Sequence, residues 1–519
     1  MRRKGVAAVW VLAILLGAGL RALPLAAARP YICYVDEGNF LHSAFQLLRE
    51  GGWIPRSFLY PHLPSVAVAS SARAVEPLYR LVRGHSLIAR IPASADVYDD
   101  LEPFGILLLA RGLVFAVSMA TVVLAGLFAR RLGGAVPGAA AALLAALAPA
   151  LVLRGSIALV DPFAAFFVTA CLVLTERTSD ARRPGIVSLA AGAMAGAAFA
   201  SKYPAALVLA AFLATTLLLR LPAREILRRL ALAVVGFGLA VAVGMPGAIL
   251  QFGEVVGALR YQLEAYAGIP WAGLWRQALV RAEADIPYAH PELGIGFVAL
   301  ALGGLVLGLR DRKTRAAAAG WCVYAGASLL LFGTRSFKPF RNVLPLVPVA
   351  CVCAALFYEA LRRRLARPGS IDALALAGVL ATLGVPLASY SWRRHELRDS
   401  RVLAVDWLVA HSGSADRVLV IRDLGVLDQE LARVRAAGGP AKAWLEEAGP
   451  RIAADAPRFV VAGDQLRFDG STLRAQEIPA IASGYGIRYA AGIRPTPPSR
   501  AWWRENDERI YVFEALQRR

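Results

Sequence analysis

Eleven apolar stretches occupy most of this chain, and basic residues lie in every second connection between them. A helix needs about 17–25 mostly apolar residues to cross a bilayer. The predicted spans are approximately residues 6–28, 104–129, 135–153, 157–175, 186–201, 203–219, 230–250, 293–309, 317–333, 342–360 and 372–390. The chain is therefore predicted to be an α-helical membrane protein with about eleven transmembrane helices.

The composition excludes most other classes of protein. Of the 519 residues, 57% are hydrophobic and only 18% are charged, whereas soluble domains have about 45–50% apolar and about 25% charged residues. The high apolar content also excludes a disordered chain. The net charge of +20 would indicate nucleic-acid binding only if the basic residues were clustered on a soluble surface.

The basic residues instead mark one side of the membrane. Six short connections hold 20 Lys and Arg against 6 Asp and Glu; they are residues 1–4, 130–131, 176–183, 220–229, 310–315 and 359–372. Cytoplasmic loops are enriched in Lys and Arg, so the N-terminus is predicted to be cytoplasmic. The first span is predicted to be an uncleaved anchor in the cell (inner or plasma) membrane, because no small-residue cleavage site is clear.

The longer segments are predicted to lie on the non-cytoplasmic side of the membrane, and they indicate two domains. Residues 1–390 are predicted to form the membrane domain, including a first outer loop at 29–103. Residues 391–519 carry 20 Lys and Arg and 17 Asp and Glu, a charge density typical of a small soluble α/β domain outside the cytoplasm. Its predicted strands are 418–421, 459–461 and 510–513, and its predicted helices are 401–411, 427–437 and 441–448.

The first outer loop contains two amphipathic segments, residues 39–48 and 66–82. Apolar side chains recur on one face of each segment, which predicts two helices. Such helices could lie in the membrane interface, or they could pack onto the helix bundle.

Three acidic residues are candidates for chemistry. Asp36 and Glu37 stand just beyond the first span, and Asp161 stands at the outer end of the fourth. Carboxylates at such positions could act as a general base and its partner, or bind a divalent cation. The alternatives are structural: the first two could begin a helix, and Asp161 could cap one that starts at Pro162. No spacing of metal ligands decides between these readings, and no cofactor is predicted with certainty.

Four basic residues lie on the predicted outer side, against the general distribution of charge. They are Lys202, Arg335, Lys338 and Arg341. Ammonium and guanidinium groups near the membrane surface suit a phosphate or pyrophosphate ester. Lipid head groups are the alternative ligand.

Four further residues are weaker candidates for substrate contacts. Tyr60 and His62 follow a Gly-Gly-Trp-Ile-Pro turn, and Tyr266 and Trp271 lie in a second outer loop. His62 could instead be a hydrogen-bonding scaffold residue. The aromatic rings could belong to an interfacial aromatic belt.

The order of these motifs resembles a family. Asp36-Glu37-Gly38 opens a helix, Gly51-Gly52-Trp53 and a Tyr-Pro turn follow, and Asp161 and Lys202 come later. A basic Ser-x-Lys-x-x-Arg-x-x-Leu-Pro-x-x-Pro segment then leads into a late span. The pattern over about residues 1–390 resembles the multi-spanning C-type glycosyltransferases that use polyprenyl-phosphate sugars, among them protein O-mannosyltransferases and the aminoarabinose transferases of lipid A.

The resemblance implies roles for individual residues. Asp36, Glu37 and Asp161 match acidic residues of the family's site. Lys202 matches the lysine of its fifth/sixth hairpin, and Lys338 and Arg341 match the basic residues before its Leu-Pro-x-x-Pro segment. Two departures separate the chain from the aminoarabinose branch. Asn39-Phe40 stands where that branch has Arg-Tyr. Residues 60–64 stand where that branch has a Lys-Pro-Pro turn, so the phosphate-binding lysine of that turn is missing here. Modification of lipid A is therefore not predicted.

The predicted function is transfer of a sugar from a polyprenyl-phosphate donor to a lipid, glycan or protein acceptor outside the cytoplasm, with inversion. One alternative is a transporter or flippase for a lipid-linked or anionic solute that uses Asp161 and Lys202 as relay residues. Transporters often show internal repeats, and the sequence has none that we detect. A non-catalytic assembly protein is the other alternative.

Overall fold

The computed structural model describes residues 3–26, 35–89, 91, 104–265, 295–333, 340–364, 368–380, 400–421, 440–443, 445–463, 477–491 and 510–516. Contacts divide the chain into two compact units. The first contains Met1–Leu25, Asn39–Ala89 and Leu108–Ser391. The second contains Trp392–Arg519 together with Ala26–Gly38 and Arg90–Leu107. The predicted domain boundary at residue 390 lies outside the described residues.

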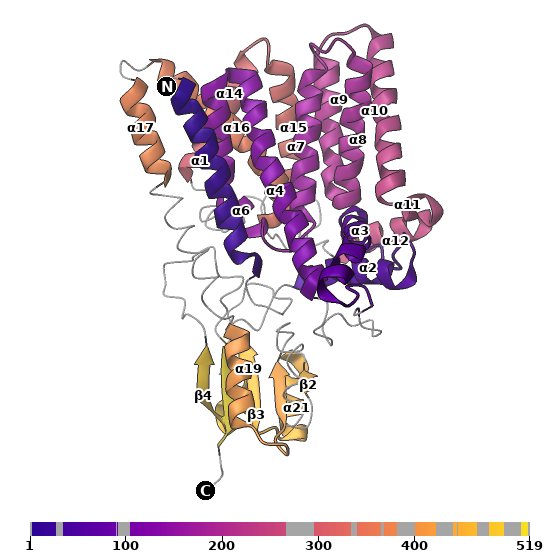
Figure 1. The fold of residues 1–519 in the computed structure, drawn as a ribbon, viewed down its shortest axis with the longest axis vertical. Helices are drawn as coiled ribbons and strands as arrows, with labels where there is room; N and C mark the ends of the chain where they lie inside the picture. Colours follow the sequence, from indigo (N-terminus) through magenta and orange to yellow (C-terminus); the bar gives the residue numbers. More distant parts are fainter. Residues whose placement is uncertain are drawn as a thin grey trace, which may run out of the picture. The chain divides into compact units, whose positions relative to one another are not determined.

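The first unit is built from helices, most of which run side by side along a common direction (Figure 1). Its longer helices are α1 (Arg3–Ala22), α2 (Val35–Glu50), α3 (Leu63–Arg83), α4 (Phe104–Gly133), α5 (Ala135–Leu147), α7 (Asp161–Arg177), α8 (Pro184–Ser201), α9 (Val208–Leu218), α10 (Ala223–Gly244), α12 (Phe252–Ala265), α14 (Ile295–Arg310), α15 (Arg315–Gly333), α16 (Val347–Arg364) and α17 (Pro368–Val379). The first four residues of α2 and of α4 are assigned to the second unit. Its shorter helices are η1 (Leu23–Ala26), α6 (Pro149–Arg154), η2 (Tyr203–Leu207), α11 (Gly247–Leu250) and η4 (Phe340–Leu346).

Six helical segments of the described part are long and apolar enough to cross a membrane. They are Gly5–Leu25, Gly105–Gly133, Pro184–Ser201, Ala223–Gly244, Arg315–Phe332 and Arg341–Arg364. Ala135–Leu147, Tyr203–Leu218 and Phe297–Arg310 are shorter apolar helices. Each of the eleven predicted spans overlaps a helix. The chain is thus a multi-pass membrane protein, and the count of eleven crossings stays a prediction.

One predicted span is divided in the structure. The stretch 135–153 forms two helices, α5 and α6, with Ala148 between them in an extended conformation (φ −65°, ψ 116°). Pro149 explains the break, because the residue before a proline is disfavoured in the helical region.

Three of the predicted cytoplasmic connections contact one another. Arg131 Nε is 2.6 Å from Glu176 Oε2, and Arg131 Nη2 is 2.7 Å from Asp180 Oδ2. Arg229 Nη1 donates to Thr178 O over 2.9 Å. The contacts thus join three connections that the charge pattern assigns to the same side.

A fully buried arginine ties the first span to the bundle. Arg21 Nε donates to Ser118 Oγ on α4 over 2.9 Å. Its Nη1 and Nη2 donate to Ala146 O (2.9 Å) and Ala145 O (3.2 Å), at the end of α5. Helix ends leave carbonyl groups without partners, so the guanidinium caps α5 from a neighbouring helix.

Helices α8 and α10 approach each other closely through glycines. A Cβ atom at Gly192 would lie 1.9 Å from Ala233 O, and one at Gly236 would lie 2.0 Å from Leu189 O. Small residues allow this backbone approach in membrane helices, where dispersion contacts drive association. The pair matters for the site because α8 ends at Ser201, directly before Lys202.

We expect Gly236→Ala to destabilise the protein, because its methyl group would force the two backbones apart. Overpacking typically costs about 1–3 kcal/mol. Gly238→Ala is the matched control: its Cβ would meet nothing within 4 Å, and alanine favours helix over glycine by about 1 kcal/mol. Thermal unfolding in detergent should give a lower midpoint for Gly236→Ala alone. Equal midpoints for the two variants would contradict the close packing.

The two outer-loop helices form as predicted, and α2 packs inside the protein. The predicted apolar face of α2 is at most 6% exposed throughout; it consists of Phe40, Leu41, Ala44, Phe45, Leu47 and Leu48. Arg73 on α3 donates to Leu47 O over 2.7 Å. The apolar face of α2 is therefore covered by the rest of the protein and is not free to lie in the membrane interface. Helix α3 exposes Leu78, Leu81 and Val82 in its second half.

The second unit contains a five-stranded sheet in the order β2-β1-β3-β5-β4. The strands are β1 (Val418–Ile421), β2 (Pro440–Ala443), β3 (Phe459–Gly463), β4 (Tyr485–Ala491) and β5 (Ile510–Ala515). Strand β1 pairs in parallel with β2 and β3, and β5 is antiparallel to β3 and β4. Helix α19 (Ser400–His411) covers one face, and α21 (Leu445–Asp455) and α22 (Pro479–Gly484) cover the other.

The small α/β prediction is confirmed, with one error in its elements. The three predicted strands and the helix at 401–411 are present. The predicted helix at 441–448 is wrong at its start, because Pro440–Ala443 forms strand β2 and α21 begins at Leu445. Strand β4 was not predicted, and the predicted helix at 427–437 lies outside the described residues.

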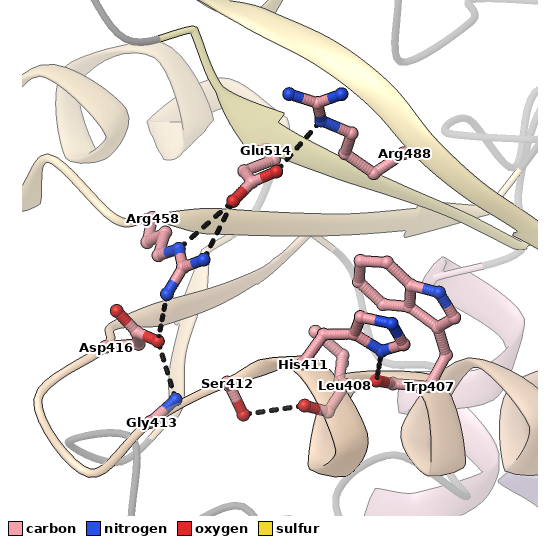
Figure 2. A network of polar contacts seen from close by, with 9 residues as sticks. All are labelled: Trp407, Leu408, His411, Ser412, Gly413, Asp416, Arg458, Arg488 and Glu514. Carbon is pink, nitrogen blue, oxygen red and sulfur yellow. Dashed lines mark hydrogen bonds and ion pairs between the residues drawn. The ribbon is translucent and has the colours of Figure 1, made fainter.

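Charged side chains link the strands of this unit at their ends (Figure 2). Arg458 Nη1 is 2.6 Å from Asp416 Oδ2, and its Nη2 is 3.0 Å from Glu514 Oε1. Arg488 Nε is 2.9 Å from the other oxygen of Glu514. Arg458 and Arg488 are about half exposed, so these pairs contribute at most about 1 kcal/mol each.

Candidate functional site

Asp161 is the first residue of α7, and its carboxylate is buried. Pro162 suits the first turn of a helix because it needs no amide hydrogen there. The N-cap position belongs to Val160, and no side chain caps the helix. The capping role that the sequence left open is therefore not observed. Instead, Asp161 Oδ1 accepts a hydrogen bond from Lys202 Nζ over 2.5 Å.

Lys202 lies at the break between α8 and η2. Its backbone is extended (φ −156°, ψ 117°), and its amide closes the last turn of α8 by donating to Ala198 O. Its side chain is 17% exposed. The sequence placed Lys202 and Asp161 on the same side of the membrane, and the structure brings them together as an ion pair.

Asn342 completes this cluster, and sequence reasoning missed it. Its Oδ1 atom accepts a second hydrogen bond from Lys202 Nζ over 2.7 Å. It lies in η4, two residues before Leu344, which is fully buried. The available signal was a polar residue at the start of an apolar span, beside the candidate Arg341. We refer to Asp161, Lys202 and Asn342 as the lysine cluster.

The structure describes one of the other three predicted cations. Arg341 is half-buried and precedes Asn342 in η4. Arg335 and Lys338 lie outside the described residues. The structure therefore supports the proximity of η4 to Lys202 and leaves the rest of the predicted cation group as a prediction.

The loop before α3 is anchored next to the lysine cluster. Tyr203, the residue after Lys202, donates from its hydroxyl to Phe58 O over 2.7 Å. Gln262 Nε2 on α12 donates to Leu59 O. Phe58 and Tyr203 belong to one buried apolar group with Met245. The outer loop is thus fastened to the same helix break that carries Lys202.

His62 is a scaffold residue of this loop. It is fully buried, its Nε2 donates to Ser57 O over 3.1 Å, and its ring lies 4.5 Å from that of Phe58. Burial lowers the pKa of His62 to about 4, so the ring is neutral at neutral pH. Tyr60 is half-buried, and Tyr266 and Trp271 lie outside the described residues.

Asp36 and Glu37 occupy the first turn of α2, which begins at Val35. Carboxylates at this position interact favourably with the helix dipole, as the structural alternative required. Glu37 is fully buried, whereas the side chain of Asp36 lies outside the described part of the structure. Their catalytic roles stay predictions.

The described residues do not fit a divalent cation at the lysine cluster. Among them, no three or more His, Cys, Asp or Glu side chains are grouped so that they could hold a metal ion. Asp161 also faces the ammonium group of Lys202, which would repel a cation bound to the same carboxylate. We therefore derive no chemical step through a metal ion.

The chain is similar to known proteins. Residues 106–249 match the family described as dolichyl-phosphate-mannose-protein mannosyltransferase, and both Asp161 and Lys202 lie within that match. The solved structure of ArnT from Cupriavidus metallidurans bound to undecaprenyl phosphate is similar over 99% of this chain and 98% of that one, with a TM-score of 0.56 at 14% identity. The chain has the C-type glycosyltransferase fold.

A second solved structure supports the same C-type glycosyltransferase fold. The Archaeoglobus fulgidus oligosaccharyltransferase, solved as a complex with zinc and sulfate, is similar over 92% of this chain and 71% of that one. Its TM-score is 0.53 at 14% identity. No curated protein matches the chain in sequence. At these identities the likeness shows the fold of the C-type enzymes, and the chemistry must be argued from the residues.

Proposed function

We propose that the chain is a membrane glycosyltransferase that moves a sugar from a polyprenyl-phosphate donor to an acceptor outside the cytoplasm. The observation that carries this proposal is the Asp161–Lys202 ion pair. Ionisable residues within membrane helices are expensive to bury and usually functional. Here the pair lies within the region that matches a mannosyltransferase family.

The proposed reaction is a displacement at the anomeric carbon. The acceptor hydroxyl loses its proton to Asp36, and its oxygen forms the new bond to the anomeric carbon from the face opposite the phosphate. The bond between that carbon and the phosphate oxygen breaks, and its electron pair leaves with the polyprenyl phosphate. Attack from the opposite face inverts the configuration of the sugar.

The cations are proposed to stabilise the leaving group. A departing phosphate monoester gains negative charge, and donors aimed at developing charge lower the barrier. Lys202 and Arg341 are the described candidates, and the sequence adds Arg335 and Lys338. Asp161 holds the ammonium of Lys202, and Glu37 is the proposed partner of Asp36.

The similar structures support this choice of donor and acceptor. ArnT was solved with undecaprenyl phosphate. The archaeal oligosaccharyltransferase was solved with an inhibitory peptide and a dolichol-phosphate. A lipid-linked donor and a lipid, glycan or protein acceptor therefore follow by analogy. The basic connections favour a cytoplasmic N-terminus and an outward-facing site in the cell membrane.

The test is consumption of the donor by protein purified in detergent. The probes are undecaprenyl-phosphate-linked hexoses and pentoses, supplied with a membrane extract as the source of acceptors. We expect release of undecaprenyl phosphate that requires both the protein and the extract. A transporter would move such lipids across vesicle bilayers without releasing undecaprenyl phosphate, and that result would contradict the proposal.

A further inference from the structure

The ammonium group of Lys202 has two acceptors, on two different structural elements. Asp161 Oδ1 at the start of α7 lies 2.5 Å from Nζ, and Asn342 Oδ1 in η4 lies 2.7 Å from it. An ammonium carries three N–H donors. Within the described part of the chain, two of these have partners. The third is therefore the one that a ligand can reach, since the side chain keeps 17% of its surface exposed.

The two acceptors have different electrostatic effects. The carboxylate of Asp161 balances the charge of Lys202, so the pair has no net charge. The amide of Asn342 holds the ammonium without adding a second negative charge. A carboxylate at position 342 would make the cluster negative, and a phosphate near Lys202 would then be repelled.

The position of Asn342 is held by packing. Leu344, two residues later in η4, is fully buried, and Val347 begins the buried face of α16. The amide therefore reaches Lys202 from an element that is anchored on its own. Such anchoring is what a group needs in order to orient another residue.

We infer that Asn342 is a positioning residue for Lys202: it directs the third N–H of the ammonium to the phosphate of the polyprenyl ligand, and its neutral amide preserves the affinity for that phosphate. The inference rests on the proposed function, because it names the group of the donor that Lys202 meets. Asn342 itself acts through Lys202 and need not touch the reacting atoms.

A structural role for Asn342 predicts a different response to substitution. If the amide only fastened η4 to α8, aspartate would serve at least as well, because hydrogen bonds between charged groups are stronger. If the amide serves phosphate binding, Asn342→Asp should preserve folding and weaken binding of the phosphate. Asn342→Leu removes the acceptor without adding charge and provides a second variant.

The experiment compares undecaprenyl phosphate with undecaprenol, which has the same chain and no phosphate. Binding to the purified protein is followed by intrinsic tryptophan fluorescence in detergent, and thermal midpoints are measured without ligand. Gln251→Glu is the matched control. It makes the same change of amide to acid at an exposed residue at the end of α11.

We expect Asn342→Asp to weaken binding of undecaprenyl phosphate about tenfold to a hundredfold, with an unchanged midpoint and unchanged binding of undecaprenol. Asn342→Leu should weaken phosphate binding severalfold, and Gln251→Glu should bind like the wild type. Equal preference for the phosphate in wild type and Asn342→Asp would overturn the inference and leave the proposed function standing. If Asn342→Asp loses binding of both lipids and its thermal midpoint is lowered, the inference is also overturned, in favour of a structural role. If the wild type itself does not prefer the phosphate, the proposed donor is wrong.

Discussion

Replacing Asp36 by asparagine is expected to lower the rate of sugar transfer by about 10²–10⁴-fold, the usual contribution of a general base. Asparagine has nearly the same shape and cannot take the proton from the acceptor hydroxyl. Its effect on folding should be small, because a charge at the first turn of a helix contributes about 0.3–1 kcal/mol. The measurement is release of undecaprenyl phosphate per unit of folded protein.

Glu50→Gln is the control for this variant. Glu50 is the last residue of the same helix α2, and it pairs with the exposed Arg56 over 2.9 Å. The substitution makes the same chemical change at the opposite end of α2, so turnover should be close to that of the wild type. An Asp36→Asn protein with full activity would exclude Asp36 as the base.

Loss of one partner of the Asp161–Lys202 pair is expected to abolish transfer and destabilise the fold. Lys202→Met leaves the buried carboxylate of Asp161 without its counter-charge, and breaking a buried pair in this way costs about 3–5 kcal/mol. Thermal unfolding in detergent should show a midpoint lowered by several degrees. Turnover should also fall, because the leaving phosphate loses a cation.

The double variant Asp161→Asn/Lys202→Met distinguishes chemistry from structure. Replacing both charges of a buried pair is often neutral for stability, so the midpoint should recover toward the wild type. Transfer should stay lost, because the cation is still missing. Recovery of turnover with stability would show that the pair is only structural. Arg260→Met/Glu264→Gln removes an exposed pair on α12 and should affect neither quantity.

The sequence was sufficient to predict the membrane class, the helices and the individual charged residues of the lysine cluster. Apolar length and the distribution of Lys and Arg depend on the bilayer, so they can be read without knowledge of packing. Asp161 and Lys202 were both assigned to the outer side. Their pairing across 41 residues depends on how α7 and α8 pack, which no local pattern contains.

Other features could not be predicted because tertiary contacts decide them. Asn342 is uncharged, and its role appears only once η4 lies beside Lys202, 140 residues earlier in the chain. Residues 440–443 carry little β-propensity, and they form β2 because β1 offers a free edge to pair with. Pro149 is a sequence signal for the break at Ala148. The proline lies within a long apolar run, however, and that run favoured the prediction of a single span.

Arg21 has a consequence for how the protein is made. Its bonds reach Ser118 and Ala146, which lie 97 and 125 residues later in the chain. During synthesis α1 emerges before α4 and α5, so neither partner is available to it. Its guanidinium must then stay at the water interface by extending its side chain, because an unpaired cation is costly in lipid. The first helix can therefore reach its final position only after α4 and α5 have entered the membrane.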